Sequence, residues 1–479
     1  MTSNTSNANF RLKVLSIEQI QKIHKATLDV LQHVGIQITE PQSLALLEKA
    51  GADISDTKRI KIPPSVVEKA IQQAPDNVLL YNRNGQQALQ LTGTNIYYGA
   101  HGDCPSILDP VTSQRRNFLA EDAAMIAKVC DYLPQIDFIS LNGFADDCLD
   151  PKYAVPLNFA KMVTNTTKPL GFSCDDEEVY DKVLDIAGIV AGGKEQLRQK
   201  PFLYHFCEPI SPLVHGTPSL RKIIKSVESG IPVVYYPMPM VGTTAPCSFT
   251  GTLILANAES LTGLIITQLL EPGASFIYGG IPGIMDMRTT IYSYGAPEML
   301  LMVKAMTDMA HHYKLPMFGT AGCSDAKIVD QQAAIEATLS CHCAALSGAN
   351  LIHDIGFLDH AVVVSAEMMV LCDEIIAMIK QTLSQFDVME NDMIIDLIDK
   401  VGPGGNYLAE EHTLANFRKN WSPTLMDRTR FEEAQKQQTL SFSEKINEKT
   451  LKIMETHKPE PLAPEIEKQI SGIAQKWLK

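Results

Sequence analysis

The sequence predicts an α/β protein built around a closed (β/α)8 TIM barrel, with a helical segment before it and a helical extension after it. Eight short apolar segments that end in small or polar residues lie between Ile96 and Gly356, and their starts are about 30 to 43 residues apart. Each interval has room for one helix and its loops. Two intervals, Thr217–Gly230 and Asp330–Gly348, carry clear helix signals. Eight β-then-α units favour a closed parallel barrel over an open sheet.

The first 95 residues predict a helical segment that ends in a small hairpin. Ser16 can cap a helix over Ser16–Gly35, in which apolar residues recur at helical spacing and Gly35 stops the helix. Two shorter helices and a hairpin complete residues 1–95: Pro41–Ala50, Pro64–Ala74, and strands around Val78–Arg83 and Ala88–Leu91.

The barrel itself is expected over residues 96–386. Its eight predicted strands are Ile96–Gly102, Asp137–Gly143, Pro169–Cys174, Pro201–Glu208, Pro232–Met238, Ser275–Gly280, Pro316–Gly322 and Asn350–Gly356. Residues 387–479 form the predicted extension, with helices over Asp387–Val401, Asp427–Thr456 and the tail Ala463–Lys479. The charged helices of this extension suggest contacts between subunits, and hence a homo-oligomer.

Composition excludes several classes of function. The chain has 41 basic and 55 acidic residues, a net charge of −14, which argues against nucleic acid and against an anionic membrane surface. The 10 cysteines are scattered, as in a reducing cytoplasm, and Met1–Arg11 lacks the apolar core of an export signal. The apolar runs Gly251–Glu271 and Ala361–Lys380 contain acidic residues, so they predict buried helices and not membrane spans.

The stretch Ser275–Glu298 has the layout of one wall of a barrel active site. A strand leads into glycines, a loop carries Asp286 and Arg288, and Pro297 opens a helix. Arg288 is therefore a candidate for ligand binding. The alternative is an Asp286–Arg288 ion pair that only braces the loop.

Candidate site residues come from the carboxyl ends of the strands, because these ends face the substrate in such barrels. They include Tyr97, Tyr98, His101, Asp175, His205, Glu208, Tyr235, Tyr236, Tyr278, Asp325, His353, Asp354 and Phe357. No Cys/His set has zinc-site spacing, and Cys341–His342–Cys343 lies in a predicted helix where the three cannot converge on one ion, so we predict no bound metal. A rim of aromatic rings suits an organic cation, which is recognised by ring faces. The alternative is that the tyrosines simply pack the barrel mouth.

Long stretches of the chain resemble the trimethylamine methyltransferase family. They read GGIPGIMDMRTTIYSYGAPE at Gly279–Glu298, GTAGCSDAK at Gly319–Lys327, and HDIGFLDHAVVVSAEMMVLCDE at His353–Glu374, and Val14–Ile36 fits as well. The resemblance implies a (β/α)8 barrel that removes a methyl group from a methylated amine and passes it to a corrinoid protein. Trimethylamine-specific members carry pyrrolysine, whereas this chain has only the ordinary residues and reads Ala-Gly-Cys-Ser-Asp at the seventh strand end.

The branch without pyrrolysine implies a quaternary amine as substrate, because a quaternary nitrogen is already cationic and leaves as a neutral amine. Glycine betaine is favoured, with proline betaine, carnitine, γ-butyrobetaine or choline as alternatives. No catalytic residue is assigned. In this interpretation the amine contacts the rings of Tyr97, Tyr98, Tyr278 and Phe357, its carboxylate binds His353, Arg288 or His205, and Glu208 or Asp325 offsets its charge.

Two other classes of protein are alternatives to this interpretation. One is a methyltransferase barrel in which zinc activates a thiol or alcohol. The other is a non-catalytic protein that binds cations or serves in assembly.

Overall fold

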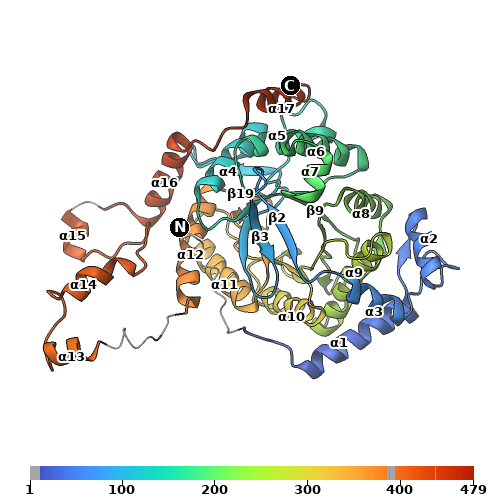
Figure 1. The fold of residues 1–479 in the computed structure, drawn as a ribbon, viewed down its shortest axis with the longest axis horizontal. Coiled ribbons are helices and arrows are strands. Elements are labelled where there is room, and N and C mark those ends of the chain that lie inside the picture. The colour runs from blue at the N-terminus through green and yellow to red at the C-terminus, as the bar shows by residue number, and fades with distance from the viewer. Residues whose placement is uncertain (1–10, 386–387, 389–393, 437–438, 479) are drawn as a thin grey trace.

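A computed structural model of the chain describes residues 11–385, 388, 394–436 and 439–478 (Figure 1). Its centre is a closed barrel of eight parallel strands, in which each strand pairs with the next along the chain and the last pairs with the first. The predicted barrel is confirmed, strand by strand. The strands are β4 (Tyr97–Ala100), β7 (Phe138–Ile139), β8 (Leu170–Phe172), β9 (Leu203–Cys207), β11 (Val233–Tyr235), β13 (Phe276–Gly279), β16 (Met317–Thr320) and β17 (Leu351–His353).

Helices follow the strands and form the outer ring. They are α4 (Ala120–Tyr132), α5 (Ala154–Thr164), α6 (Glu177–Ala191), α7 (Lys194–Gln199), α8 (Thr217–Ser229), α9 (Phe249–Leu270), α10 (Pro297–Tyr313), α11 (Gln331–Ser347) and α12 (Ala366–Leu383). Of the described helices, α9 alone is long and apolar enough to cross a membrane, and 83% of its most apolar window is buried inside the protein. It is therefore a core helix of the barrel, as the sequence predicts.

The N-terminal helices pack against the barrel at α9. Ser16 caps α1 (Ile17–Asp29) in a reciprocal capping box with Gln19, and a π-helical turn over Val30–Val34 leads to Gly35. Helices α2 (Pro41–Ala50) and α3 (Pro64–Gln73) follow as predicted, and all three contact α9. A short parallel pair, β1 (Gln37–Ile38) with β10 (Val214–His215), attaches this segment to the barrel.

The predicted hairpin, β2 (Val78–Tyr81) and β3 (Gln87–Leu91), covers the barrel at the end where the strands begin (Figure 1). The Tyr81 N–H donates to the carbonyl of Pro201, immediately before β9. Leu80 and Leu91 are fully buried in one apolar cluster with Tyr97 and other residues of the barrel interior. This hairpin closes the N-terminal end of the barrel, so the C-terminal end is where a ligand has access.

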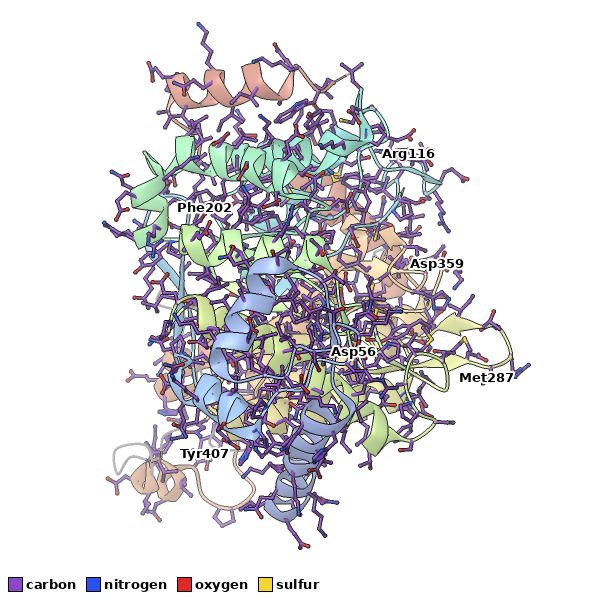
Figure 2. The ribbon with its side chains drawn as sticks, turned by 90° about the vertical axis from the view of Figure 1, so that its right-hand side faces the viewer. Asp56, Arg116, Phe202, Met287, Asp359 and Tyr407 are labelled. Atoms are coloured by element: carbon purple, nitrogen blue, oxygen red, sulfur yellow. The ribbon has the colours of Figure 1, made fainter. Side chains whose placement is uncertain are left out.

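Loops at the C-terminal end form small sheets of their own. One sheet joins β5 (Ser106–Leu108), β6 (Arg115–Asn117), β18 (Phe357–Leu358) and β19 (Val363–Val364); another joins β12 (Met240–Val241), β14 (Gly283–Asp286) and β15 (Ile291–Tyr292). Figure 2 shows Arg116, Met287 and Asp359 at this end, opposite Phe202 at the start of β9. The stretch after β13 is thus a protruding hairpin and not the irregular loop that the sequence suggested.

The C-terminal extension leaves the barrel and returns to it. Helices α13 (Ile395–Val401), α14 (Glu411–Asn416) and α15 (Phe431–Lys436) extend away from the barrel, whereas α16 (Phe442–Thr456) contacts α12 and α4, and α17 (Pro464–Ala474) contacts α5 and α6 (Figure 1). The helix predicted over Asp387–Val401 is shorter in the structure and begins at Ile395; residues 386–387 and 389–393 lie outside the described ones. The charged helices predicted over Asp427–Thr456 are α15 and α16.

Candidate active site

A cleft of about 490 Å³ lies at the C-terminal end of the barrel. Its walls come from the segments that follow β4, β8, β9 and β11 and from the first turns of α8. Substrates of (β/α)8 enzymes bind at this end of the strands. The residues that matter for its chemistry are Asp103, Phe144, Asp175, Phe206, Glu208 and Lys222.

The cleft is acidic. Asp103, Asp175 and Glu208 each follow a different strand and meet in one wall, beside a single ammonium group, that of Lys222. Asp103 and Glu208 stay open to solvent. Although the Glu208 side chain reaches solvent, desolvation by the surrounding protein raises its pKa to about 7. The nearby charge of Asp103 adds to this shift. Desolvation by the cleft walls also raises the pKa of Asp103, although its side chain reaches solvent, and the charges of Asp354 and Asp175 add to this shift.

Phe206 connects the cleft to an aromatic cluster in the barrel centre. Its ring centroid lies 4.8 Å from that of His101, 5.6 Å from Tyr236 and 5.8 Å from Phe318. His353 stacks on Phe318 at 4.2 Å. A cation that rests on Phe206 therefore has the carboxylates on one side and a set of ring faces behind it, an arrangement suited to an organic ammonium group.

His353 and Asp354 form a buried pair next to this cluster. The His353 Nδ1 lies 2.5 Å from the carbonyl of Gly319, so Nδ1 carries the proton and donates it. Its Nε2 faces the Asp354 carboxyl at 3.3 Å. Burial lowers the pKa of His353 to about 3 and raises that of Asp354 to about 7, so the imidazole is neutral at neutral pH. The Thr320 hydroxyl donates to Asp354 at 2.5 Å.

The structure separates the predicted tyrosines into two groups. Tyr97 points into the barrel toward the β2–β3 hairpin, where its hydroxyl accepts the Gln90 N–H at 3.2 Å. Tyr98 and Tyr278 point outward to the helices, since their hydroxyls donate to the Cys341 carbonyl and the Asn257 side chain. None of these three lines the cleft.

The other predicted residues are also dispersed. His205 lies outside the strand wall, with its Nδ1 3.1 Å from the Ser226 hydroxyl. Arg288 is exposed at the tip of the β14–β15 hairpin, where its backbone N–H donates to Asp286. Asp325 holds loops together by accepting from Ser293 and Tyr294 and by facing His360.

Of the nine residues that the sequence assigned to substrate binding, only Glu208 lines the cleft itself, together with Asp175, another of the strand-end candidates. His353 lies behind it in the aromatic cluster, and Phe357 is fully buried against Gly102.

Four residues of the cleft were not among the candidates from the sequence: Asp103, Phe144, Phe206 and Lys222. Asp103 follows the predicted strand Ile96–Gly102 by one position, so its place after a strand end was the available signal. Phe206 lies inside a predicted strand, and nothing in the pattern distinguishes it from a core residue. Lys222 comes from the α8 helix, and its ammonium donates to the carbonyl of Cys174. Strand ends alone do not indicate such a residue.

Comparison with known proteins places the chain among methyltransferases of methylated amines. Residues 2–476 match the model of the trimethylamine methyltransferase (MTTB) family. The chain is 33% identical to trimethylamine methyltransferase MttB of Desulfitobacterium hafniense, over 97% of this chain and 94% of the relative. It is 29% identical to a glycine betaine methyltransferase from another strain of that species, over 97% of both.

Solved structures share the fold. The monomethylamine methyltransferase MtmB of Methanosarcina barkeri superposes with a TM-score of 0.51 over 94% of this chain and 89% of that one, at 14% sequence identity.

Proposed function

Because the chain belongs to the trimethylamine methyltransferase family, we propose that it moves a methyl group from a quaternary amine to the Co(I) of a corrinoid protein. The organic product is a dimethylated amine. The corrinoid is carried by a partner protein and acts here as a second substrate. The proposed location is the cytoplasm, and the proposed assembly is a homo-oligomer.

The observation that carries this proposal is the acidic, ring-backed cleft at the open end of a barrel of this family. Three carboxylates and the ring of Phe206 surround a space of about 490 Å³, large enough for a small ammonium compound. Ring faces and carboxylates attract a quaternary nitrogen, which has no N–H to donate. Asp103 and Glu208 are open to solvent, so a second reactant has access from outside.

The chemistry suits a chain of ordinary residues. As the C–N bond breaks, its electron pair stays on nitrogen, which leaves as a neutral tertiary amine. The methyl carbon receives a pair from Co(I), which becomes Co(III). No proton has to be supplied. The protein's part is to align the methyl carbon with the cobalt and to exclude water. A cleft suited to the cation binds the ground state at least as well as the transition state, so it provides placement and selectivity.

The identity of the amine is a separate question within this proposal. Glycine betaine is favoured by the resemblance, and one relative is named as a glycine betaine methyltransferase. Proline betaine, carnitine, γ-butyrobetaine and choline are the alternatives.

The proposal is tested by incubating the purified protein with free cob(I)alamin and each quaternary amine under anoxic, reducing conditions. We expect the absorbance of cob(I)alamin to fall as methylcobalamin forms, with one equivalent of the dimethylated amine detected by mass spectrometry. The proposal is contradicted if methylcobalamin forms equally fast without the protein. It is also contradicted if none of the amines in the panel gives methylcobalamin. Loss of activity on adding a zinc chelator points instead to the barrel class that uses zinc.

A further inference from the structure

The cleft has more negative than positive groups, and this difference affects which amine it can bind. Asp103, Asp175 and Glu208 contribute three carboxylates, and Lys222 contributes one ammonium. Lys222 is only 7% exposed, and its ammonium already donates to the backbone carbonyl of Cys174. The cleft therefore presents mainly negative charge to a bound ligand.

The three side chains that the sequence assigned to a substrate carboxylate lie outside the cleft. Arg288 is at the tip of the β14–β15 hairpin, and His205 faces Ser226 behind the strand wall. His353 donates its Nδ1 proton to Gly319, and burial lowers its pKa to about 3, so it brings no positive charge. None of the three is among the residues that line the cleft.

The spacing of charges within a betaine makes this inequality important. In glycine betaine one methylene separates the nitrogen from the carboxylate. When the trimethylammonium group rests on Phe206, the carboxylate must lie in the same cleft, beside Asp103 and Glu208. Like charges at such short range repel strongly where water is partly excluded. Desolvation by the surrounding protein is the main cause that raises the pKa of Glu208 to about 7, and the neighbouring Asp103 carboxylate adds to it.

We infer that this cleft takes quaternary ammonium compounds that have no carboxylate beside the nitrogen, of the choline type, in preference to glycine betaine. The inference rests on the proposed function for the identity of the site and adds the class of substrate. A cation without a carboxylate lowers the net negative charge of the cleft by one, whereas a zwitterion leaves the net charge as it was and adds a fourth carboxylate.

Binding to the full-length protein, measured by isothermal titration calorimetry without any corrinoid, tests the inference directly. The probes are choline, glycine betaine, the amide of glycine betaine and 3,3-dimethylbutan-1-ol, the uncharged isostere of choline. We expect choline to bind at least 10-fold more tightly than glycine betaine, the amide to recover most of this difference, and the uncharged alcohol not to bind. Glycine betaine binding as tightly as choline, or more tightly, overturns the inference.

Variants of the carboxylates show whether the preference comes from this cleft. Glu208→Gln and Asp103→Asn should each reduce the ratio of choline affinity to glycine betaine affinity about 3-fold or more. Most of this change should come from weaker binding of choline. Asp185→Asn, at an exposed carboxylate of α6 that pairs with Lys194, is the matched control and should keep the ratio. If one variant does not fold, Asp175→Asn replaces it. An unchanged ratio in every folded cleft variant overturns the inference.

Failure of the inference is distinguishable from failure of the proposed function. If glycine betaine methylates cob(I)alamin with a higher kcat/KM than choline, the inference is wrong and the proposed function holds. If choline binds preferentially but no amine gives methylcobalamin, the charge preference holds and the proposed function is wrong. If neither compound binds nor reacts, both are wrong.

Discussion

Asp354 combines three unusual properties in one side chain. Its backbone lies in the left-handed region at φ 72°, which costs energy for a residue that is not glycine. Its carboxyl is 4% exposed, and burial raises its pKa to about 7. It also accepts the Thr320 hydroxyl and faces His353. Strained, buried and titratable residues cluster at functional sites, and Asp354 faces His353 of the aromatic cluster and lies near enough to Asp103 of the cleft to raise its pKa.

The raised pKa predicts how stability depends on pH. The folded protein holds a proton on Asp354 up to about pH 7, whereas the unfolded chain loses it near 3.8. The stabilisation due to this proton is complete below about pH 4 and is lost as the pH rises through 7. Asparagine cannot titrate. In urea unfolding, the stability of the wild type relative to Asp354→Asn should therefore fall by roughly 3 kcal/mol between pH 5 and 7.5.

If the difference in unfolding free energy between the wild type and Asp354→Asn does not change with pH, the raised pKa of Asp354 is contradicted. The Asp185→Asn variant, at an exposed carboxylate that pairs with Lys194, is the matched control.

Phe206 and Tyr97 give a matched test of which rings meet the substrate. Phe206→Leu keeps the apolar volume but removes the ring face, so KM for the amine should rise about 10-fold, the range of a desolvated cation–π contact. Tyr97→Phe removes only the hydroxyl that accepts from Gln90. It should lower the unfolding free energy by about 1 kcal/mol and leave KM unchanged. Steady-state kinetics and urea unfolding on both variants check this. A higher KM for Tyr97→Phe together with an unchanged KM for Phe206→Leu would refute it.

The sequence located the strands but not the side of the wall that each residue faces. Neighbouring residues of a strand point to opposite sides, so Tyr97 points inward and Tyr98 outward. Parallel barrel strands are apolar on both sides, and the usual alternation of apolar and polar residues is therefore missing. Without it, the inward and outward tyrosines could not be told apart from the sequence. Charged residues just after a strand, such as Glu208, were predictable because the loops that follow the strands reach solvent at the carboxyl end of the barrel.

Among the elements, the β14–β15 hairpin is the most prominent feature of the C-terminal end (Figure 2). Gly283 is required there, because a Cβ would lie 2.2 Å from the ring of Tyr292. Tyr292 in turn donates to the carbonyl of Ile281, which anchors the base of the hairpin. The tip carries Met287, which is 74% exposed. An exposed apolar side chain beside the mouth is placed to contact a partner that delivers a bulky reactant.

We expect Met287→Glu to weaken the reaction with the corrinoid protein while the reaction with free cob(I)alamin stays as it was. The new charge must lose water when the partner binds, so KM for the corrinoid protein should rise several-fold. Ile17→Glu is the control, since Ile17 is 72% exposed on α1 in the N-terminal segment. Equal effects on both acceptors would mean that the hairpin acts on the cleft itself.

Element boundaries were predictable where proline and glycine mark them. Helices α2, α3 and α10 each have proline in the first turn, and α6, α8 and α11 end at glycines in the left-handed conformation. The β14–β15 hairpin was missed because its strands are only four and two residues long, too short for an alternation of apolar and polar residues to be visible.

At the scale of the whole molecule, the arm formed by α13, α14 and α15 differs from the barrel. It lies apart from the barrel in Figure 1, and its apolar side chains are exposed: Phe431 by 76%, Leu408 by 86% and Leu414 by 72%. The arm is nevertheless attached, because the Glu374 carboxylate of α12 accepts the N–H groups of Thr424 and Leu425 and the Thr424 hydroxyl. A fixed arm with exposed apolar groups is expected to be covered by another surface.

A second copy of the chain is the expected cover, because most oligomers of soluble proteins are symmetric assemblies of identical chains. Light scattering should then give a mass that is a multiple of 52.7 kDa. The double substitution Leu408→Asp and Leu414→Asp should shift the protein to a smaller species, since each carboxylate would be buried without a partner at the interface. Val111→Asp, at an exposed site of the barrel's own loops, should not change the mass. A wild type that is monomeric at micromolar concentration would leave the arm's apolar side chains to a different partner and contradict the predicted homo-oligomer.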